Sequence, residues 1–206
     1  MLDTSGLTGI AIVIICILIS LVIHEFMHAY VGHLLGDTTA HDQGRLSLNP
    51  LNHIDPVMTI ALPIITLILF HAPILAAKPV PFNPDRVKFD EFGAALIAAA
   101  GPFSNLVLAI IGAAILHLTG VNGSTLLGTF VTTFIWLNIA LFVFNLVPIP
   151  PLDGSRVLYA FAPEPIQDFM RTIEQYGLIL IFALVLFAGF GGFLGTIDQA
   201  IYNFLT

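Results

Sequence analysis

Long apolar runs alternate with short polar, proline-rich segments along this chain. The first apolar run, residues 4–23, contains no charged residue. It is about long enough to cross a bilayer as a helix, which requires about 20 residues. We expect this helix to run from about Gly6 to Leu35 and to end at Gly36, because glycine readily adopts the left-handed conformation that terminates helices.

Further apolar runs predict additional helices. Full spans are expected at 91–118, 125–147 and around 176–188, with short helices at 154–162 and 193–205. The run 57–77 is also apolar but contains Pro63 and Pro73, so it either crosses the membrane or enters and returns as a broken hairpin. The pattern therefore predicts an all-α integral membrane protein, a multi-pass bundle of about five to six helices.

Two polar segments, 37–56 and 78–90, interrupt the apolar runs. Prolines at 79, 81 and 84 exclude a helix from the second segment. In the first, Gly44 to Leu48 alternates enough to allow a short strand, so we expect a small β-strand or hairpin element near the active site. Such a strand either pairs with an extended substrate or is an ordinary loop strand, and the sequence does not decide between them.

Composition supports a membrane protein with one domain covering residues 1–206. The chain is 57% hydrophobic and only 9% charged. It has no basic patch, so a nucleic-acid partner is not expected. The single cysteine, Cys16, cannot form an internal disulfide. A cleavable signal peptide is not expected either, because the start lacks a basic region and contains Asp3.

The chemically most informative stretch is HEFMH, residues 24–28, in the first predicted helix. His24 and His28 are four residues apart and so share one helix face. Two such histidines with a glutamate beside the first form the zinc-hydrolase arrangement, in which the imidazoles hold the metal and Glu25 acts on its water. A chance match, or histidines with ordinary buried hydrogen bonds, is the alternative. Ionisable groups cost at least about 2.5 kcal/mol within hydrocarbon, which favours a functional metal site inside the membrane.

A catalytic zinc needs a third protein ligand and one open position. The next glutamate is distant, at Glu91, and the pattern HExxHxxGxxH fails because Val31 and Leu34 occupy the required positions. His33 points to a different face of the helix. Asp153 is the best remaining candidate, because it lies in a proline-broken segment after an apolar span, where irregular backbone is tolerated only if it lines a polar cavity. Alone, Leu-Asp-Gly is more typical of a turn, and only the missing zinc ligand favours the metal role.

Three motifs in order, HEFMH, GPFSN at 101–105 and NLVPIPPLDG at 145–154, resemble the site-2 protease family of intramembrane zinc metalloproteases. The polar segments GRLSLNPLNHIDP and AAKPVPFNP are similar to those of short bacterial or archaeal members that lack PDZ and CBS domains. The resemblance implies one zinc ion per chain, held by His24, His28 and Asp153. It also implies that Glu25 is the catalytic acid/base and that Asn145 helps to bind the substrate backbone.

The same resemblance assigns less to other positions. Gly101 and Asn105 are expected only to pack closely or to make a polar contact between helices. Arg45, His53 and Asp55 fit the pattern of the short members without an assignable role.

These observations together predict an enzyme that hydrolyses peptide bonds within or near transmembrane segments of membrane-protein substrates. We expect a multi-pass protein of a bacterial or archaeal cell membrane, whose partners are the lipid bilayer and transmembrane proteins. The physiological substrate and the oligomeric state are left open. One alternative is a transporter or channel with an intramembrane metal site, but such a protein should spread acidic residues along several spans. A second alternative is an inactive scaffold that binds helices. The presence of all the motif residues, His24, Glu25, His28 and Asp153, argues against it.

The basic residues predict an orientation. All six can lie on one side of the membrane if 57–77 enters and returns, whereas Arg45 alone changes sides if this run crosses. The positive-inside rule favours the first arrangement. We therefore expect four full spans plus one broken segment, with the metal-bearing end of the first helix facing the cytoplasm and the amino terminus outside.

Overall fold

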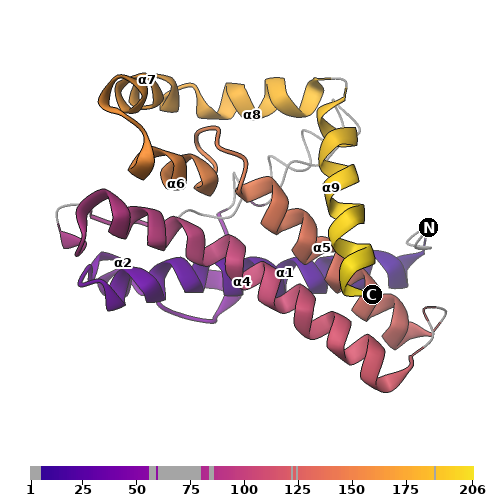
Figure 1. The fold of residues 1–206 in the computed structure, drawn as a ribbon. Helices are drawn as coiled ribbons and strands as arrows, with labels where there is room; N and C mark the ends of the chain where they lie inside the picture. The colour runs from indigo at the N-terminus through magenta and orange to yellow at the C-terminus, as the bar shows by residue number, and fades with distance from the viewer. Residues whose placement is uncertain are drawn as a thin grey trace.

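The computed structural model describes residues 6–55, 59, 80–83, 86–121, 123, 125–187 and 189–206 (Figure 1). Within these ranges the chain forms eight α-helices and one short 3-10 helix. In chain order they are α1 (Leu7–Leu34), α2 (Thr39–Asp42), η1 (Pro50–Asn52), α4 (Asp90–Thr119), α5 (Leu126–Asn145), α6 (Asp153–Phe161), α7 (Glu164–Glu174), α8 (Gly177–Leu186) and α9 (Phe190–Leu205).

Three of these helices, α1, α4 and α5, are long and apolar enough to cross a membrane. Their bounds agree with the predicted spans to within two residues, because each coincides with a continuous apolar run. The expected end of the first helix is also confirmed, since Gly36 follows α1 with a φ of 102°. A side chain at this φ would be strained, so glycine lets the chain leave the helix at this point.

Helix α4 lies at the centre and packs against α1, α5 and α6 (Figure 1). Small residues bring α4 and α5 close together: Ala109 and Ala113 are buried against Val131, Ile135 and Ile139. Close approach through small residues is the usual way in which membrane helices gain packing energy, since lipid offers no hydrophobic drive for their association.

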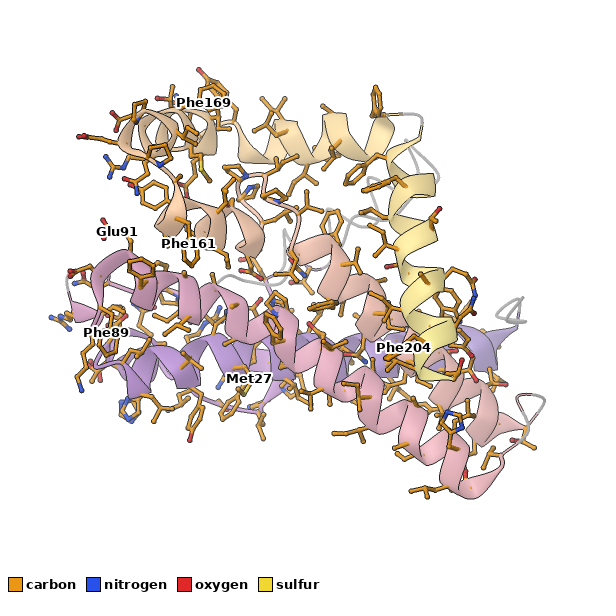
Figure 2. The ribbon with its side chains drawn as sticks, viewed as in Figure 1. Met27, Phe89, Glu91, Phe161, Phe169 and Phe204 are labelled. Carbon is orange, nitrogen blue, oxygen red and sulfur yellow. The ribbon has the colours of Figure 1, made fainter. Side chains whose placement is uncertain are left out.

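The carboxyl-terminal helices are arranged around this three-helix core. Figure 1 shows α7 and α8 on the far side of α6 from α4, and α9 runs back to pack against α5. Phe161 at the end of α6 meets Phe92 of α4, with ring centroids 5.3 Å apart and the rings edge to face. Figure 2 shows this phenylalanine below α6, facing α4.

The predicted strand at Gly44–Leu48 is wrong, because the described residues contain no strand. Backbone carbonyls of this segment, which would be hydrogen-bonded to a neighbouring strand in a sheet, instead accept hydrogen bonds from side chains further along the chain. Asn52 donates from Nδ2 to the Gly44 carbonyl at 3.0 Å, and His53 donates from Nε2 to the Ser47 carbonyl at 2.6 Å. The side chain of Arg45 donates to the carbonyl of Asn52. The segment is therefore an irregular loop held by its own side chains.

The number of helices also differs from the expected five or six. Sequence reasoning did not predict α2 or α7, although α7 has a proline in its first turn and is amphipathic. The last predicted span is wrong as a full crossing, since α8 has 10 residues and a span needs about 20. The run 57–77 lies outside the described residues, apart from position 59, so its path stays a prediction.

Hydrogen bonds to the side chain of Asp37 connect the loop after α1 with the segment that precedes α4. It is 2% exposed, and its Oδ1 accepts hydrogen bonds from the backbone N and Oγ1 of Thr39 at 3.0 and 2.5 Å. Its Oδ2 accepts from the backbone N of Asn83 at 2.7 Å. Burial raises the pKa of Asp37, but these hydrogen bonds and the charge of Arg86 outweigh burial and hold the pKa below its ordinary value of 3.8.

We expect Asp37→Asn to lower the thermal unfolding midpoint of the detergent-solubilised protein at neutral pH by a few degrees. The lost charge-assisted hydrogen bonds are worth about 1.5–3 kcal/mol. A carboxyl group whose folded pKa is depressed stabilises above its unfolded pKa and loses that effect as pH falls through the folded value. The difference between wild type and variant should therefore narrow below about pH 4. An equal difference at pH 7 and in acid would contradict this role for the ionised carboxylate.

Candidate metal centre

Two histidines of α1 form one side of a compact, buried cluster. His24 and His28 are 4% and 8% exposed, and their Nε2 atoms are 3.0 Å apart. The helical period places them one turn apart on the face of α1 that packs against α4. The structure thus confirms that these two side chains point to the same place.

Asp153 completes the cluster from the first residue of α6. Its Oδ2 lies 3.2 Å from Nε2 of His24 and 3.4 Å from Nε2 of His28. The next residue explains how α6 reaches this position: a Cβ on Gly154 would lie 2.2 Å from the carbonyl oxygen of Leu146. Only glycine lets α6 approach the end of α5 so closely, and this approach directs Asp153 toward α1.

The donor set and its geometry fit a zinc ion. Tetrahedral zinc with bonds of about 2.0–2.2 Å to nitrogen and oxygen places its ligand atoms about 3.4 Å apart. The three observed separations, 3.0, 3.2 and 3.4 Å, come close to this spacing. Within the described part of the chain, His24, His28 and Asp153 are the one group of three or more such side chains that could hold a metal ion.

The space beside the histidines depends on a missing side chain in α4. A Cβ added to Gly101 would lie 2.3 Å from Nε2 of His28 and 2.6 Å from Nε2 of His24. These nitrogens are the atoms that would face a metal. Gly101 therefore leaves open the side of the cluster that an alanine would fill.

Hydrogen bonds on the far side of each imidazole orient the rings. His28 donates from Nδ1 to the carbonyl of Ile97 at 2.7 Å, and Nδ1 of His24 lies 2.6 Å from Oδ1 of Asn105. A proton on Nδ1 leaves the lone pair of Nε2 free to bind a metal. Sequence reasoning expected no more than a polar contact for Asn105. A lone asparagine inside an apolar span was the available signal, because it is expensive in hydrocarbon without a partner.

Glu25 follows the first histidine and is 7% exposed. No hydrogen bond or ion pair engages its carboxylate among the described residues, so the group has no competing partner there. The carboxylate of Glu25 interacts electrostatically with the guanidinium of Arg45. Arg45 lies in the loop after α1 and is 4% exposed. Burial lowers the pKa of the Arg45 guanidinium, and the charge of Glu25 opposes that shift.

Asn145 does not join the cluster of donor atoms. It is the last residue of α5, half-buried, and its Nδ2 donates to the carbonyl of Leu141 one turn earlier at 2.9 Å. Its predicted contact with substrate backbone stays a prediction.

The chain is similar to proteins named as zinc metalloproteases. The model of peptidase family M50 matches residues 122–188, which include α5 and Asp153. Over 178 residues the chain is 40% identical to the protein named "Putative zinc metalloprotease YwhC" of Bacillus subtilis, covering 83% of this chain and 78% of that protein. The chain belongs to peptidase family M50. Two further relatives of this M50 chain, named "Putative zinc metalloprotease Rip2", are 28% identical in Mycolicibacterium smegmatis and 29% identical in Mycobacterium tuberculosis, each over 82% of this chain and 64% of the relative. No solved structure matches this M50 chain.

Membership of M50 confirms the predicted resemblance to the site-2 protease family. This M50 chain is a zinc metalloprotease of the site-2 type, with bacterial relatives and three helices that can span a membrane. The His–His–Asp cluster lies where two of those helices meet α6.

Proposed function

We propose that this M50 peptidase hydrolyses peptide bonds within or near transmembrane segments of membrane-protein substrates, in the membrane of a bacterial or archaeal cell. One zinc ion per chain would be held by His24, His28 and Asp153. The observation that carries the proposal is the triangle of three donor atoms, with sides of 3.0–3.4 Å, at the contact of α1 with α4 and α6.

The chemistry follows from the groups around this triangle. Bound zinc supplies Lewis acidity, which polarises a substrate carbonyl and makes water easier to deprotonate near neutral pH. Glu25 takes a proton from the attacking water and later delivers it to the leaving amine. Its buried carboxylate, without a competing partner among the described residues, suits it to both transfers.

Substrate binding requires an extended backbone, since a helix hides its carbonyls in internal hydrogen bonds. A membrane-spanning substrate must therefore unwind locally before it is cut. The amide of Asn145 is suited to hold the unwound stretch, because it lies at the end of α5, eight positions before Asp153, and is half-buried.

A transporter or channel remains the competing function. The described core argues against it, because away from the helix ends the only histidine, lysine, arginine or carboxylate side chains within α1, α4 and α5 are those of His24, Glu25 and His28. These three lie at one site and do not line a path along several helices. An inactive scaffold that binds membrane helices would keep the fold without the chemistry, so only activity separates it from a protease.

The proposal predicts zinc-dependent cleavage by the purified protein. In proteoliposomes that contain a panel of single-span membrane proteins, we expect cleavage that a chelator stops and added Zn²⁺ restores. Elemental analysis should find one zinc per chain, falling to a small fraction of that value in Asp153→Ala. Wild-type protein that contains no zinc would overturn the metal assignment. Cleavage that persists after complete zinc removal would overturn the mechanism.

A further inference from the structure

A chain of buried amides lies behind His24 and joins three helices. Asn105 of α4 and Asn138 of α5 are both 0% exposed. Asn105 donates from Nδ2 to Oδ1 of Asn138 at 2.9 Å and to the carbonyl of Ser20 in α1 at 3.4 Å. Asn138 donates from Nδ2 to the carbonyl of Phe134, one turn earlier in α5, at 2.8 Å.

The direction of every hydrogen bond in this chain is fixed by its last member. The carbonyl of Phe134 can only accept, so Asn138 must turn its NH₂ group toward it and its oxygen toward Asn105. Asn105 must then donate to that oxygen, which turns its own Oδ1 toward His24. Since an amide oxygen can only accept, Nδ1 of neutral His24 must carry the proton.

We infer that Asn138 is a positioning residue for the metal centre, because it fixes the amide of Asn105 and thereby holds His24 in the tautomer whose Nε2 is free to bind metal. This inference deepens the proposed function and rests on the assignment of His24 as a zinc ligand. Among the described residues, the side chain of Asn138 is hydrogen-bonded to Asn105 and to the carbonyl of Phe134, and to none of the three metal ligands. We therefore expect its effect on His24 to pass through Asn105.

His28 provides an internal comparison. Its Nδ1 donates directly to the carbonyl of Ile97, with no amide between them. A backbone carbonyl cannot turn round, so the tautomer of His28 does not depend on Asn138. A change at Asn138 should therefore affect one histidine of the pair and leave the other unchanged.

A merely structural role for Asn138 makes a different prediction. In that case the amide pair would only hold α4 against α5, as polar residues often do between membrane helices. Its loss would loosen both histidines alike, or neither, and would show as a lower thermal midpoint. The tautomer of His24 separates the two roles.

The experiment compares Asn138→Leu with Asn138→Asp in the full-length, metal-free protein. Leucine removes the closer of the two acceptors of the Asn105 amide and leaves only the long hydrogen bond to the Ser20 carbonyl. The amide can then turn its NH₂ group toward His24 at a lower cost, which favours the proton on Nε2. The ring ¹⁵N shifts of histidine-labelled protein, assigned to His24 by difference against His24→Gln, should report this change. Zinc affinity, measured by chelator competition, should fall about 10- to 100-fold, as is usual when support behind a ligand is lost.

At this buried position aspartate is expected to be neutral, so its hydroxyl can donate to the Phe134 carbonyl while its other oxygen accepts from Asn105. Asn138→Asp should therefore keep the wild-type tautomer and most of the zinc affinity. Thr133→Val is the matched control, because Thr133 is a buried polar residue of the same helix whose hydroxyl has no partner among the described residues. It should change neither measurement.

Two results would overturn the role of Asn138. One is Asn138→Leu with the wild-type tautomer of His24 and wild-type zinc affinity. The other is Asn138→Asp with the Nε2 tautomer of His24 and the reduced zinc affinity expected for Asn138→Leu. This second result can be tested even if the leucine variant does not fold. A wild-type protein that binds no zinc would instead defeat the proposed function, while the tautomer measurement, made without metal, would still support or refute the link from Asn138 to His24.

Discussion

Replacing Glu25 by glutamine should reduce the rate of peptide-bond cleavage by about 10²- to 10⁴-fold, the usual contribution of a general acid–base group. Glutamine has nearly the same shape and keeps an oxygen in place, but it cannot take a proton from water. Because the three donor atoms of the metal centre belong to His24, His28 and Asp153, the variant should still bind one zinc. Cleavage of a transmembrane reporter and elemental analysis of the same preparation measure the two properties together.

The matched control is Glu91→Gln. Glu91 lies exposed at the start of α4, as Figure 2 shows, and its carboxylate is not part of the metal centre. It should retain wild-type activity. If Glu25→Gln cleaves at the wild-type rate, Glu25 is not the acid–base group. If Glu25→Gln loses its zinc as well as its activity, Glu25 is needed for metal binding, and its loss does not show a role in proton transfer.

The spanning helices were predictable because the signal for a membrane helix is local. A continuous apolar run must satisfy its own backbone within the bilayer, so its helical state follows from length and composition alone. This argument placed α1, α4 and α5 to within two residues. It failed for residues 176–188, where an apolar run contains the much shorter α8.

The loop after α1 shows where local reasoning is insufficient. The alternation at Gly44–Leu48 is compatible with a strand, but a strand requires a partner for its backbone groups. The side chains of Asn52 and His53 take those groups instead. Periodicity gives no information about such competition, because it depends on which side chains the fold brings back to the segment.

The metal centre was predictable in part for a similar reason. The pairing of His24 and His28 follows from the helical period, whereas Asp153 was reached through a missing ligand and a resemblance. The supporting asparagines were not predicted as a unit, because Asn105 and Asn138 are 33 positions apart and meet only where α4 packs on α5. Each was visible only as an isolated polar residue in an apolar run.

The most informative steric test of the centre is Gly101→Ala, which should abolish zinc binding and lower activity by about 10²-fold or more. The added methyl group would lie 2.3 and 2.6 Å from the Nε2 atoms of His28 and His24, far inside normal contact distance. The rings cannot easily move away, because Asn105 and the carbonyl of Ile97 hold their other nitrogens. Displacing a reacting group by about 1 Å is enough to cost about 10²-fold.

Helix propensity alone predicts that Gly101→Ala is favourable, whereas the packing around the metal centre predicts that it is harmful. The measured effect therefore distinguishes the two. Alanine is favoured over glycine inside a helix by about 1 kcal/mol, so Gly101→Ala considered locally should stabilise α4. Gly32→Ala in α1 is the control, since its methyl group would meet Ile97 at an ordinary 3.7 Å. In the metal-free protein, Gly32→Ala should keep the thermal midpoint at or slightly above the wild-type value, whereas Gly101→Ala should lower it, because its methyl group overlaps the two held imidazoles. Only Gly32→Ala should gain stability when zinc is added. Normal zinc binding by Gly101→Ala would mean that the metal does not lie between these two imidazoles.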